Sequence, residues 1–240
     1  MLELTDVTKS FGGLVAVRQM RFRVSAGEVV GLLGPNGSGK STVLNVISGA
    51  LPRSSGEIAF DGARIDGMPA HRIARRGVAR TFQLVRLTPS LSVRDNVLLA
   101  LAFGPNRDWG SQARDRAEAA LARVGLAGQG DGRVDDLNYI DQKRLELARA
   151  ISTEPRLLLL DEWMAGLNPT ELKYAIDLIG SLCEEGMTIL LVEHIIEAVR
   201  ALCPRSIVMC AGSKIADGPT PEVLAQEPVI EAYLGKGTHA

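Results

Sequence analysis

The feature that most constrains this chain is a short stretch, Gly34-Pro-Asn-Gly-Ser-Gly-Lys40-Ser41, in which four residues separate a glycine from Gly-Lys-Ser. An apolar run at residues 29–33 precedes it, and a helical pattern begins at about Thr42. Glycines permit positive φ angles, so consecutive backbone N–H groups can face one anion beside the positive end of a helix. The stretch therefore predicts a phosphate-binding loop between a buried strand and a helix.

This pattern assigns roles to individual residues of the loop. Lys40 is expected to reach the β- and γ-phosphates of a nucleoside triphosphate, and Ser41 is expected to ligate Mg²⁺. The other nucleotide-binding positions predicted in the loop and the first helical turn are Asn36, Gly37, Ser38, Gly39 and Thr42. A glycine-rich turn alone is weak evidence, whereas the whole pattern between a strand and a helix is strong.

A second group of polar residues follows another apolar run, at residues 156–160. This run reads as a buried strand that ends in two carboxylates, Asp161 and Glu162. Ligands bind at the carboxyl ends of parallel strands, so both side chains are expected near the phosphates. We expect Asp161 to hold Mg²⁺ through water and Glu162 to act as the general base toward the attacking water.

Composition narrows the class of protein. The 240 residues include 27 Lys+Arg and 28 Asp+Glu, a net charge of −1, and 46% hydrophobic residues. That apolar fraction excludes global disorder, and the absence of a basic excess argues against a nucleic-acid partner. No apolar run approaches the ~20 residues needed to span a bilayer, and no pattern typical of a signal peptide is expected at the start. The three cysteines are odd in number and lack zinc-ligand spacing, which is typical of reduced thiols in a cytosolic protein.

Strand and helix patterns alternate along most of the chain. Strand patterns fall at residues 2–9, 15–24, 28–33, 57–60, 156–160, 188–193, 206–210 and 214–217. Helical patterns fall at residues 41–48, 69–77, 93–102, 111–124, 142–152, 169–184, 196–202 and 221–233. Between residue 84 and about residue 150 the strand patterns vanish, so the chain reads as an α/β body interrupted by a helical insert.

With the loop and the two carboxylates in place, nearly the whole chain resembles the ATP-binding subunit of an ATP-binding-cassette (ABC) transporter. The resemblance implies that Phe11 stacks on adenine, with Val17 beside it, and that Gln83 in Arg80-Thr-Phe-Gln ligates Mg²⁺ and takes part in catalysis. It implies that Ala165-Gly-Leu-Asn-Pro crosses a dimer interface. It makes His194, after the strand pattern at 188–193, a catalytic residue that contacts the γ-phosphate.

The resemblance also implies a fold and a domain plan. The expected fold is an α/β P-loop NTPase (RecA-like) core with an N-terminal antiparallel β subdomain and a helical ABC-specific insert. Residues 1–240 would form a single ABC ATPase domain, with the helical subdomain at residues 84–152. ATP and Mg²⁺ are the implied cofactors.

Three short stretches resemble those of the ATPase subunits of branched-chain amino-acid importers. They are Phe11-Gly-Gly-Leu-Val-Ala-Val, Ala165-Gly-Leu-Asn-Pro-Thr-Glu and Val229-Ile-Glu-Ala-Tyr-Leu-Gly. That family implies a transport ATPase that powers import of branched-chain or related amino acids or amides. The implied partners are a second ABC ATPase subunit, two transmembrane permease subunits and, indirectly, a substrate-binding protein. The implied location is peripheral, at the cytoplasmic face of the inner or plasma membrane, with the surface at residues 84–102 as the candidate permease contact.

The chain departs from the family at the signature loop, which reads Leu-Ser-Tyr-Gly-Gln in this subgroup and clamps ATP bound to the opposite subunit. Here the loop is Leu137-Asn138-Tyr139-Ile140-Asp141. Asn caps a helix as well as Ser, but Ile140 resists positive φ and Asp141 adds an anion near a polyphosphate. Either the loop shifts and works, or the chain supplies a weakened half-site, which favours a heterodimer over a homodimer. Trp163 replaces the usual proline after Glu162, and the resemblance assigns it no role.

Two other functions compete with a transport subunit. A soluble ABC ATPase acting on DNA or ribosomes usually contains two cassettes or a long coiled-coil insert, and this sequence has neither. A different phosphate-loop enzyme, a kinase or a GTPase, is the third candidate. A GTPase needs an Asn-Lys-x-Asp motif to read guanine, and that motif is absent.

Overall fold

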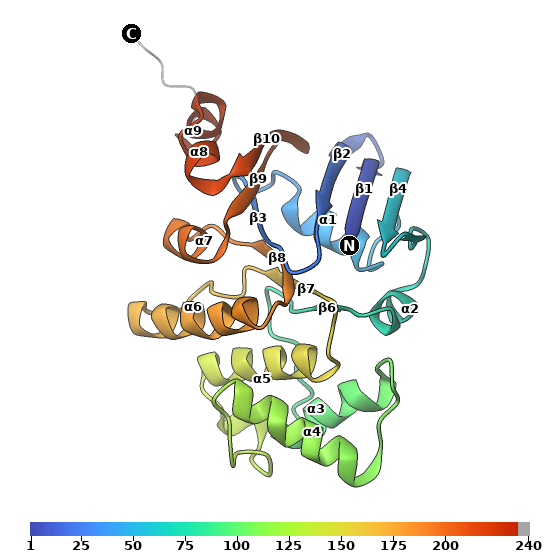
Figure 1. Cartoon of the computed structure of the whole chain (residues 1–240), viewed down its shortest axis with the longest axis vertical. Coiled ribbons are helices and arrows are strands. Elements are labelled where there is room, and N and C mark those ends of the chain that lie inside the picture. Colours follow the sequence, from blue (N-terminus) through green and yellow to red (C-terminus); the bar gives the residue numbers. More distant parts are fainter. Residues whose placement is uncertain (235–240) are drawn as a thin grey trace.

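A computed structural model describes residues 1–234, so the last six residues of the expected 1–240 domain, including Gly235 of the C-terminal pattern, lie outside it. The described chain forms two sheets with helices around them (Figure 1). The smaller sheet is antiparallel, in the order β2-β1-β4-β5. Its strands are β1 (Leu2–Phe11), β2 (Leu14–Val24), β4 (Ser55–Phe60) and β5 (Ala63–Arg64).

The larger sheet has the order β10-β9-β3-β8-β7-β6, and all its pairs are parallel except the β10–β9 hairpin at the edge. Its strands are β3 (Val29–Leu33), β6 (Val78–Arg80), β7 (Leu157–Asp161), β8 (Thr188–Val192), β9 (Arg205–Cys210) and β10 (Ser213–Pro219). The parallel strands are short and apolar because both of their faces are covered. Their carboxyl ends therefore share one edge of the sheet.

Helices cover the sheet on both faces. The helices of the α/β body are α1 (Lys40–Ile47), α2 (Ala70–Arg75), α6 (Pro169–Glu184), α7 (Ile196–Leu202), α8 (Thr220–Leu224) and α9 (Glu227–Leu234). The insert contains α3 (Val93–Phe103), α4 (Gly110–Arg123), a 3-10 turn (Val134–Asp136) and α5 (Tyr139–Ser152). It lies at the end of the molecule away from the antiparallel sheet (Figure 1). Residues 84–92, ahead of it, form no helix or strand.

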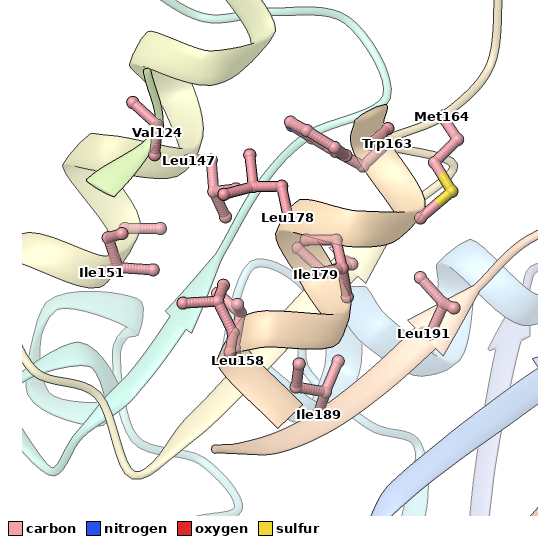
Figure 2. Close-up of a cluster of buried hydrophobic side chains, with 14 of the residues drawn as sticks. Val124, Leu147, Ile151, Leu158, Trp163, Met164, Leu178, Ile179, Ile189 and Leu191 are labelled. Atoms are coloured by element: carbon pink, nitrogen blue, oxygen red, sulfur yellow. The ribbon is translucent and has the colours of Figure 1, made fainter. Parts of the chain in front are cut away.

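The two faces of the larger sheet bury separate hydrophobic cores. Successive residues of β7 point in opposite directions, so Leu157 and Leu159 enter one core while Leu158 and Leu160 enter the other. The first core joins the larger sheet to the antiparallel sheet and α1. The second joins it to α6, α7 and the insert (Figure 2). The larger sheet thus lies between two packed layers.

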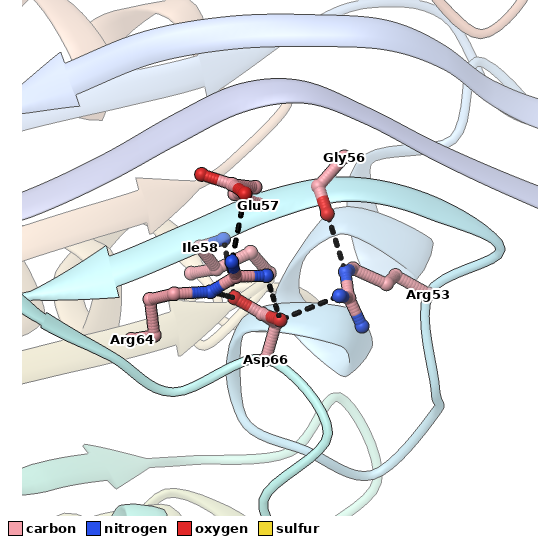
Figure 3. A network of polar contacts seen from close by, with 6 residues as sticks. All are labelled: Arg53, Gly56, Glu57, Ile58, Arg64 and Asp66. Atoms are coloured by element: carbon pink, nitrogen blue, oxygen red, sulfur yellow. Dashed lines mark hydrogen bonds and ion pairs between the residues drawn. The ribbon is translucent and has the colours of Figure 1, made fainter.

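A polar cluster fixes the end of the antiparallel sheet, where β4 turns into β5 (Figure 3). Asp66 accepts hydrogen bonds from Ile58 N–H (3.1 Å) and from Arg64, and it pairs with Arg53 (2.5 Å). Burial alone would raise the pKa of Asp66, but these donors and charges outweigh burial and lower the pKa. The cluster therefore holds the hairpin as an ion-paired unit.

In the part of the chain that the structure covers, every helix is too short or too polar to cross a bilayer.

Candidate functional site

The loop between β3 and α1 has the backbone shape of a phosphate cradle. Gly34, Gly37 and Gly39 all have positive φ angles, of 142°, 77° and 102°. A Cβ at Gly34 would lie 2.2 Å from Met209 O, and one at Gly39 would lie 2.4 Å from Ala16 O, so glycine is required at both. Gly39 is the N-cap of α1, and none of the described side chains caps the helix there. The first N–H groups of α1 are therefore open to an anion.

Lys40 occupies the inside of this loop. Its Nζ donates to the carbonyl oxygens of Gly34 (2.8 Å) and Pro35 (3.1 Å), and its side chain is buried. Burial lowers the pKa of Lys40, and the charges of Glu162 and Asp161 act in the opposite direction. The ammonium is thus already placed beside the N–H groups that would hold an anion.

The remaining predicted residues of the loop surround Lys40. Asn36 and Gly37 at the tip are exposed, Ser38 is buried, and Thr42 in the first turn of α1 is half-buried. Gly212 N–H donates to Ser38 O (3.0 Å), which joins the loop to the β9–β10 hairpin.

Asp161 ends β7 next to the start of α1. Ser41 Oγ donates to its Oδ1 (3.2 Å), and Arg80 donates to its Oδ2 (2.8 Å). The same guanidinium reaches Asn45 Oδ1 (2.8 Å) and Ser48 Oγ (3.0 Å) in α1. The side chains of Arg80 and Asp161 are 7% and 4% exposed. Arg80 therefore joins α1, β6 and β7 and fixes the carboxylate against Ser41.

Glu162 leaves β7 in a left-handed conformation, with φ of 48°. Its N–H donates to Val192 O (2.8 Å) at the end of β8. Its Oε2 accepts a hydrogen bond from Gln83 Nε2 (2.8 Å), and both side chains are reached by solvent. The segments that follow β6 and β7 thus bring Gln83 and Glu162 together, although the two residues are 79 positions apart.

Glu193 and His194 follow β8, whose Val192 pairs with Asp161. His194 is exposed at this same edge of the sheet. Glu193 is fully buried, and its Oε1 accepts a hydrogen bond from Met164 N–H (2.8 Å). Burial raises the pKa of Glu193 to about 7. The residue before His194 is therefore anchored to the segment that follows Glu162.

The antiparallel sheet approaches the loop through β2, since Ala16 O lies against Gly39. Val17 is buried in β2, whereas the Phe11 ring is 46% exposed at the end of β1. Lys9 Nζ lies 4.8 Å from the Phe11 ring centroid. An exposed aromatic ring on this side suits stacking with a base.

The loop before α5, whose sequence differs from the family's signature loop, is an ordinary capped helix start. Asn138 is the N-cap, and its side-chain oxygen accepts a hydrogen bond from Asp141 N–H (2.9 Å). Ile140 is helical and 5% exposed, so the strain expected from a positive φ does not arise. Asp141 pairs with Arg144 (2.7 Å), and Tyr139 is 49% exposed. The added bulk points inward and the added anion has a cation beside it.

Comparisons with known proteins decide the family. A family model described as ABC transporter matches residues 17–165. The chain belongs to the ABC transporter family. It is 39% identical over 251 aligned residues to the high-affinity branched-chain amino acid transport ATP-binding proteins BraF of Pseudomonas aeruginosa and LivG of Escherichia coli K12, and 98% of this chain and of each relative is covered.

Solved ABC structures show the same architecture. A nucleotide-free ATP-binding cassette from an ABC transporter matches with a TM-score of 0.89 and 27% identity, over 98% of this chain and 99% of that one. A dimeric post-hydrolysis state of the cassette MJ0796, bound to ADP and Pi, matches with a TM-score of 0.83 and 28% identity, over 92% of this chain and 99% of that one. The predicted fold class and the predicted ABC-type transport ATPase are thereby confirmed.

Two residues of the ABC site escaped sequence reasoning. Arg80 was part of a motif but received no role, although a cation three residues before Gln83 was a usable signal. Tyr233 in α9 accepts a hydrogen bond from Gly34 N–H (2.8 Å) at the start of the phosphate loop. No local pattern links two residues 199 positions apart, so only the fold shows that contact.

Proposed function

We propose that the chain hydrolyses Mg²⁺-ATP at the carboxyl edge of the larger sheet, with Glu162 as general base. The supporting observation is the contact between Glu162 Oε2 and Gln83 Nε2 (2.8 Å), next to an open helix start and the Ser41–Asp161 pair. Glu162 would accept the proton of the attacking water, which Gln83 helps to orient. His194 would contact the γ-phosphate, and Lys40 would exchange its two carbonyl partners for phosphate oxygens.

The residues at this edge fit Mg²⁺. Ser41 Oγ and Asp161 Oδ1 lie 3.2 Å apart, and the Gln83 side chain lies at the same edge. Mg²⁺ prefers oxygen ligands and usually takes only one or two carboxylates from the protein, together with water and phosphate oxygens. When bound, it would neutralise charge between the β- and γ-phosphates. Phe11 and Val17 would form the adenine side of the site.

The proposed transport role follows the relatives. BraF and LivG are branched-chain amino acid transport ATP-binding proteins, and the match spans nearly the full length of all three chains. We therefore assign this chain to an importer of branched-chain or related amino acids or amides, treating it as one ABC ATPase domain with its helical subdomain. It would act peripherally at the cytoplasmic face of the membrane, beside a second ABC ATPase subunit, either another copy or a different one.

A groove beside the insert suits a permease segment. It measures about 380 Å³ and lies between α2, β6 and the helices α3 and α5. Its lining is mostly apolar with arginines, and it includes Phe82, Arg86, Ala100, Phe103 and Arg149. Because Phe82 directly precedes Gln83, a segment seated there would lie next to the catalytic edge. Residues 84–102, proposed as the contact surface, contribute two of these positions, Arg86 and Ala100.

The decisive variant is Glu162→Gln, measured in the transporter reassembled in vesicles with its permeases. We expect kcat for ATP hydrolysis to fall by about 10²- to 10³-fold, since the general base is lost, while ATP affinity stays within about threefold. Glu197→Gln, an exposed carboxylate on α7, is the matched control. Normal turnover in Glu162→Gln would reject the assigned base. ATP hydrolysis without any ATP-dependent leucine uptake would favour the soluble ABC ATPase instead.

A further inference from the structure

Trp163, which replaces the usual proline, is fully buried directly after the catalytic carboxylate (Figure 2). Its ring packs in the core that joins the larger sheet to α5 and α6, and Leu147 and Leu178 belong to the same cluster. Its indole N–H donates to the carbonyl oxygen of Lys143 in α5 (3.1 Å). A buried indole N–H needs such a partner, so both the position and the orientation of the ring are fixed.

The residues on either side of Trp163 are bonded in the opposite direction, toward β8. Glu162 N–H donates to Val192 O (2.8 Å), and Met164 N–H donates to Glu193 Oε1 (2.8 Å). At the first of these anchors Glu162 has φ of 48°, a conformation that a non-glycine residue keeps only where its surroundings impose it. The indole N–H links this segment to α5.

The acceptor lies close to the loop that serves the opposite ATP site. Asn138 caps α5, and Lys143 lies about one turn from the first residue of that helix. A helix of this length moves as a rigid unit, so a shift of its capped end displaces Lys143 O as well. The Trp163–Lys143 bond therefore joins the signature loop to Glu162 within one subunit.

We propose that Trp163 is a positioning residue that holds Glu162 in its left-handed conformation and couples it to the signature helix. The proposal rests on the function proposed for Glu162. Its consequence is that a signature loop engaged on the ATP of the opposite subunit adjusts the base at this subunit's own ATP. Proline, which has no ring N–H and cannot reach α5, would leave the two sites without this connection.

The kinetic test compares Trp163→Phe with Trp109→Phe in the reassembled transporter. Phenylalanine keeps an aromatic ring but removes the N–H donor, whereas Trp109 is 69% exposed at the start of α4. We expect Trp163→Phe to lower kcat by about 3- to 10-fold with KM for ATP within about twofold, because the phosphate loop is untouched. Trp109→Phe should match the wild type. A wild type without turnover would reject the proposed function, whereas equal kcat in wild type and Trp163→Phe would reject this inference alone.

A second measurement does not require Trp163 to be changed. The chain contains two tryptophans, so the full-length Trp109→Phe protein reports the fluorescence of Trp163 alone. We expect its emission to change when Mg²⁺-ATP binds, and to stay constant when Lys40→Ala is added to abolish binding. An unchanged emission at ATP concentrations shown by equilibrium dialysis to saturate the site would overturn the proposal, even if Trp163→Phe fails to fold.

Discussion

The two helix starts that are proposed to face phosphate, those of α1 and α5, are built differently. α1 begins at Gly39 with φ of 102°, without a cap from any described side chain and without an acidic residue in its first turn. α5 begins at Asn138, whose side chain already takes the N–H of Asp141, and it carries that aspartate in its first turn. One helix start is left open to an anion, whereas the other is partly satisfied by the chain itself.

The buried charged side chains next to the two helices differ as well. Behind α1, Arg80 and Asp161 form a buried ion pair at 2.8 Å. Behind α5, Lys143 and Glu193 are buried, and among the described residues Lys143 Nζ and Glu193 Oε2 have no hydrogen-bond partner. A buried polar group without a partner costs free energy that a paired one does not. α1 is therefore backed by an ion pair, whereas α5 is backed by buried polar atoms that have no hydrogen-bond partner among the described residues.

The largest effect is expected when the difference between the two helix starts is removed by giving α1 the acidic residue that α5 has. Thr42 occupies in α1 the helix position that Asp141 occupies in α5, the third residue after the N-cap. Thr42→Asp should weaken ATP binding by about 100-fold or more, because a carboxylate would lie against the polyphosphate in a partly buried site. Isothermal titration with ATP measures the effect, and Thr42→Asn is the uncharged control. Binding reduced equally by both variants would attribute the loss to shape and not to charge.

A second test concerns Glu193, the buried carboxylate behind α5. The pKa of Glu193 is raised from 4.5 to about 7, so the folded protein binds a proton there that the unfolded chain has lost. This raised pKa makes stability fall as the pH rises from about 4.5 to about 7, with no further loss above that range. Glu193→Gln cannot titrate and keeps an acceptor for Met164 N–H. It should therefore be about 2–3 kcal/mol more stable than wild type at pH 8, and the gain should shrink at pH 5.

Urea denaturation at the two pH values measures this difference in the free energy of unfolding. Glu197→Gln on the exposed side of α7 serves as the control and should behave like wild type at both. If Glu193→Gln changed stability by the same amount at pH 5 and pH 8, the carboxylate would not be titrating with a raised pKa.

The smallest expected effect comes from the reciprocal exchange, Asp141→Thr. It removes an anion that would face the ATP of the opposite subunit in the proposed dimer but already has Arg144 as a partner at 2.7 Å. ATP turnover of the assembled transporter should therefore rise only about two- to fivefold, and the stability of the isolated chain should change by less than about 1 kcal/mol. Asp177→Thr on the exposed face of α6 is the control. A fall in turnover would mean that Asp141 assists the loop and that the half-site is not weakened by its charge.

Most elements could be predicted because their patterns are local. The apolar runs that became β3, β7 and β8, and the capped periodic stretches that became α5 and α6, each contain their own signal. The strand β6 was missed because three residues, Val78–Arg80, are too few for a pattern, and their strand pairing comes from β7. That omission hid Arg80, the residue that ties Asp161 to α1.

The sequence by itself determined the phosphate loop, the order of strands and helices along the chain, and the family resemblance. Glycine spacing and apolar periodicity carry this information because they depend on neighbouring residues alone. Only the tertiary structure decided how the departures from the family are accommodated. Ile140 is turned inward, Asp141 is paired with Arg144, and Trp163 donates to α5, since each depends on partners supplied by packing. Strain and charge that look unfavourable along the chain are resolved by contacts that form only when helices and strands meet.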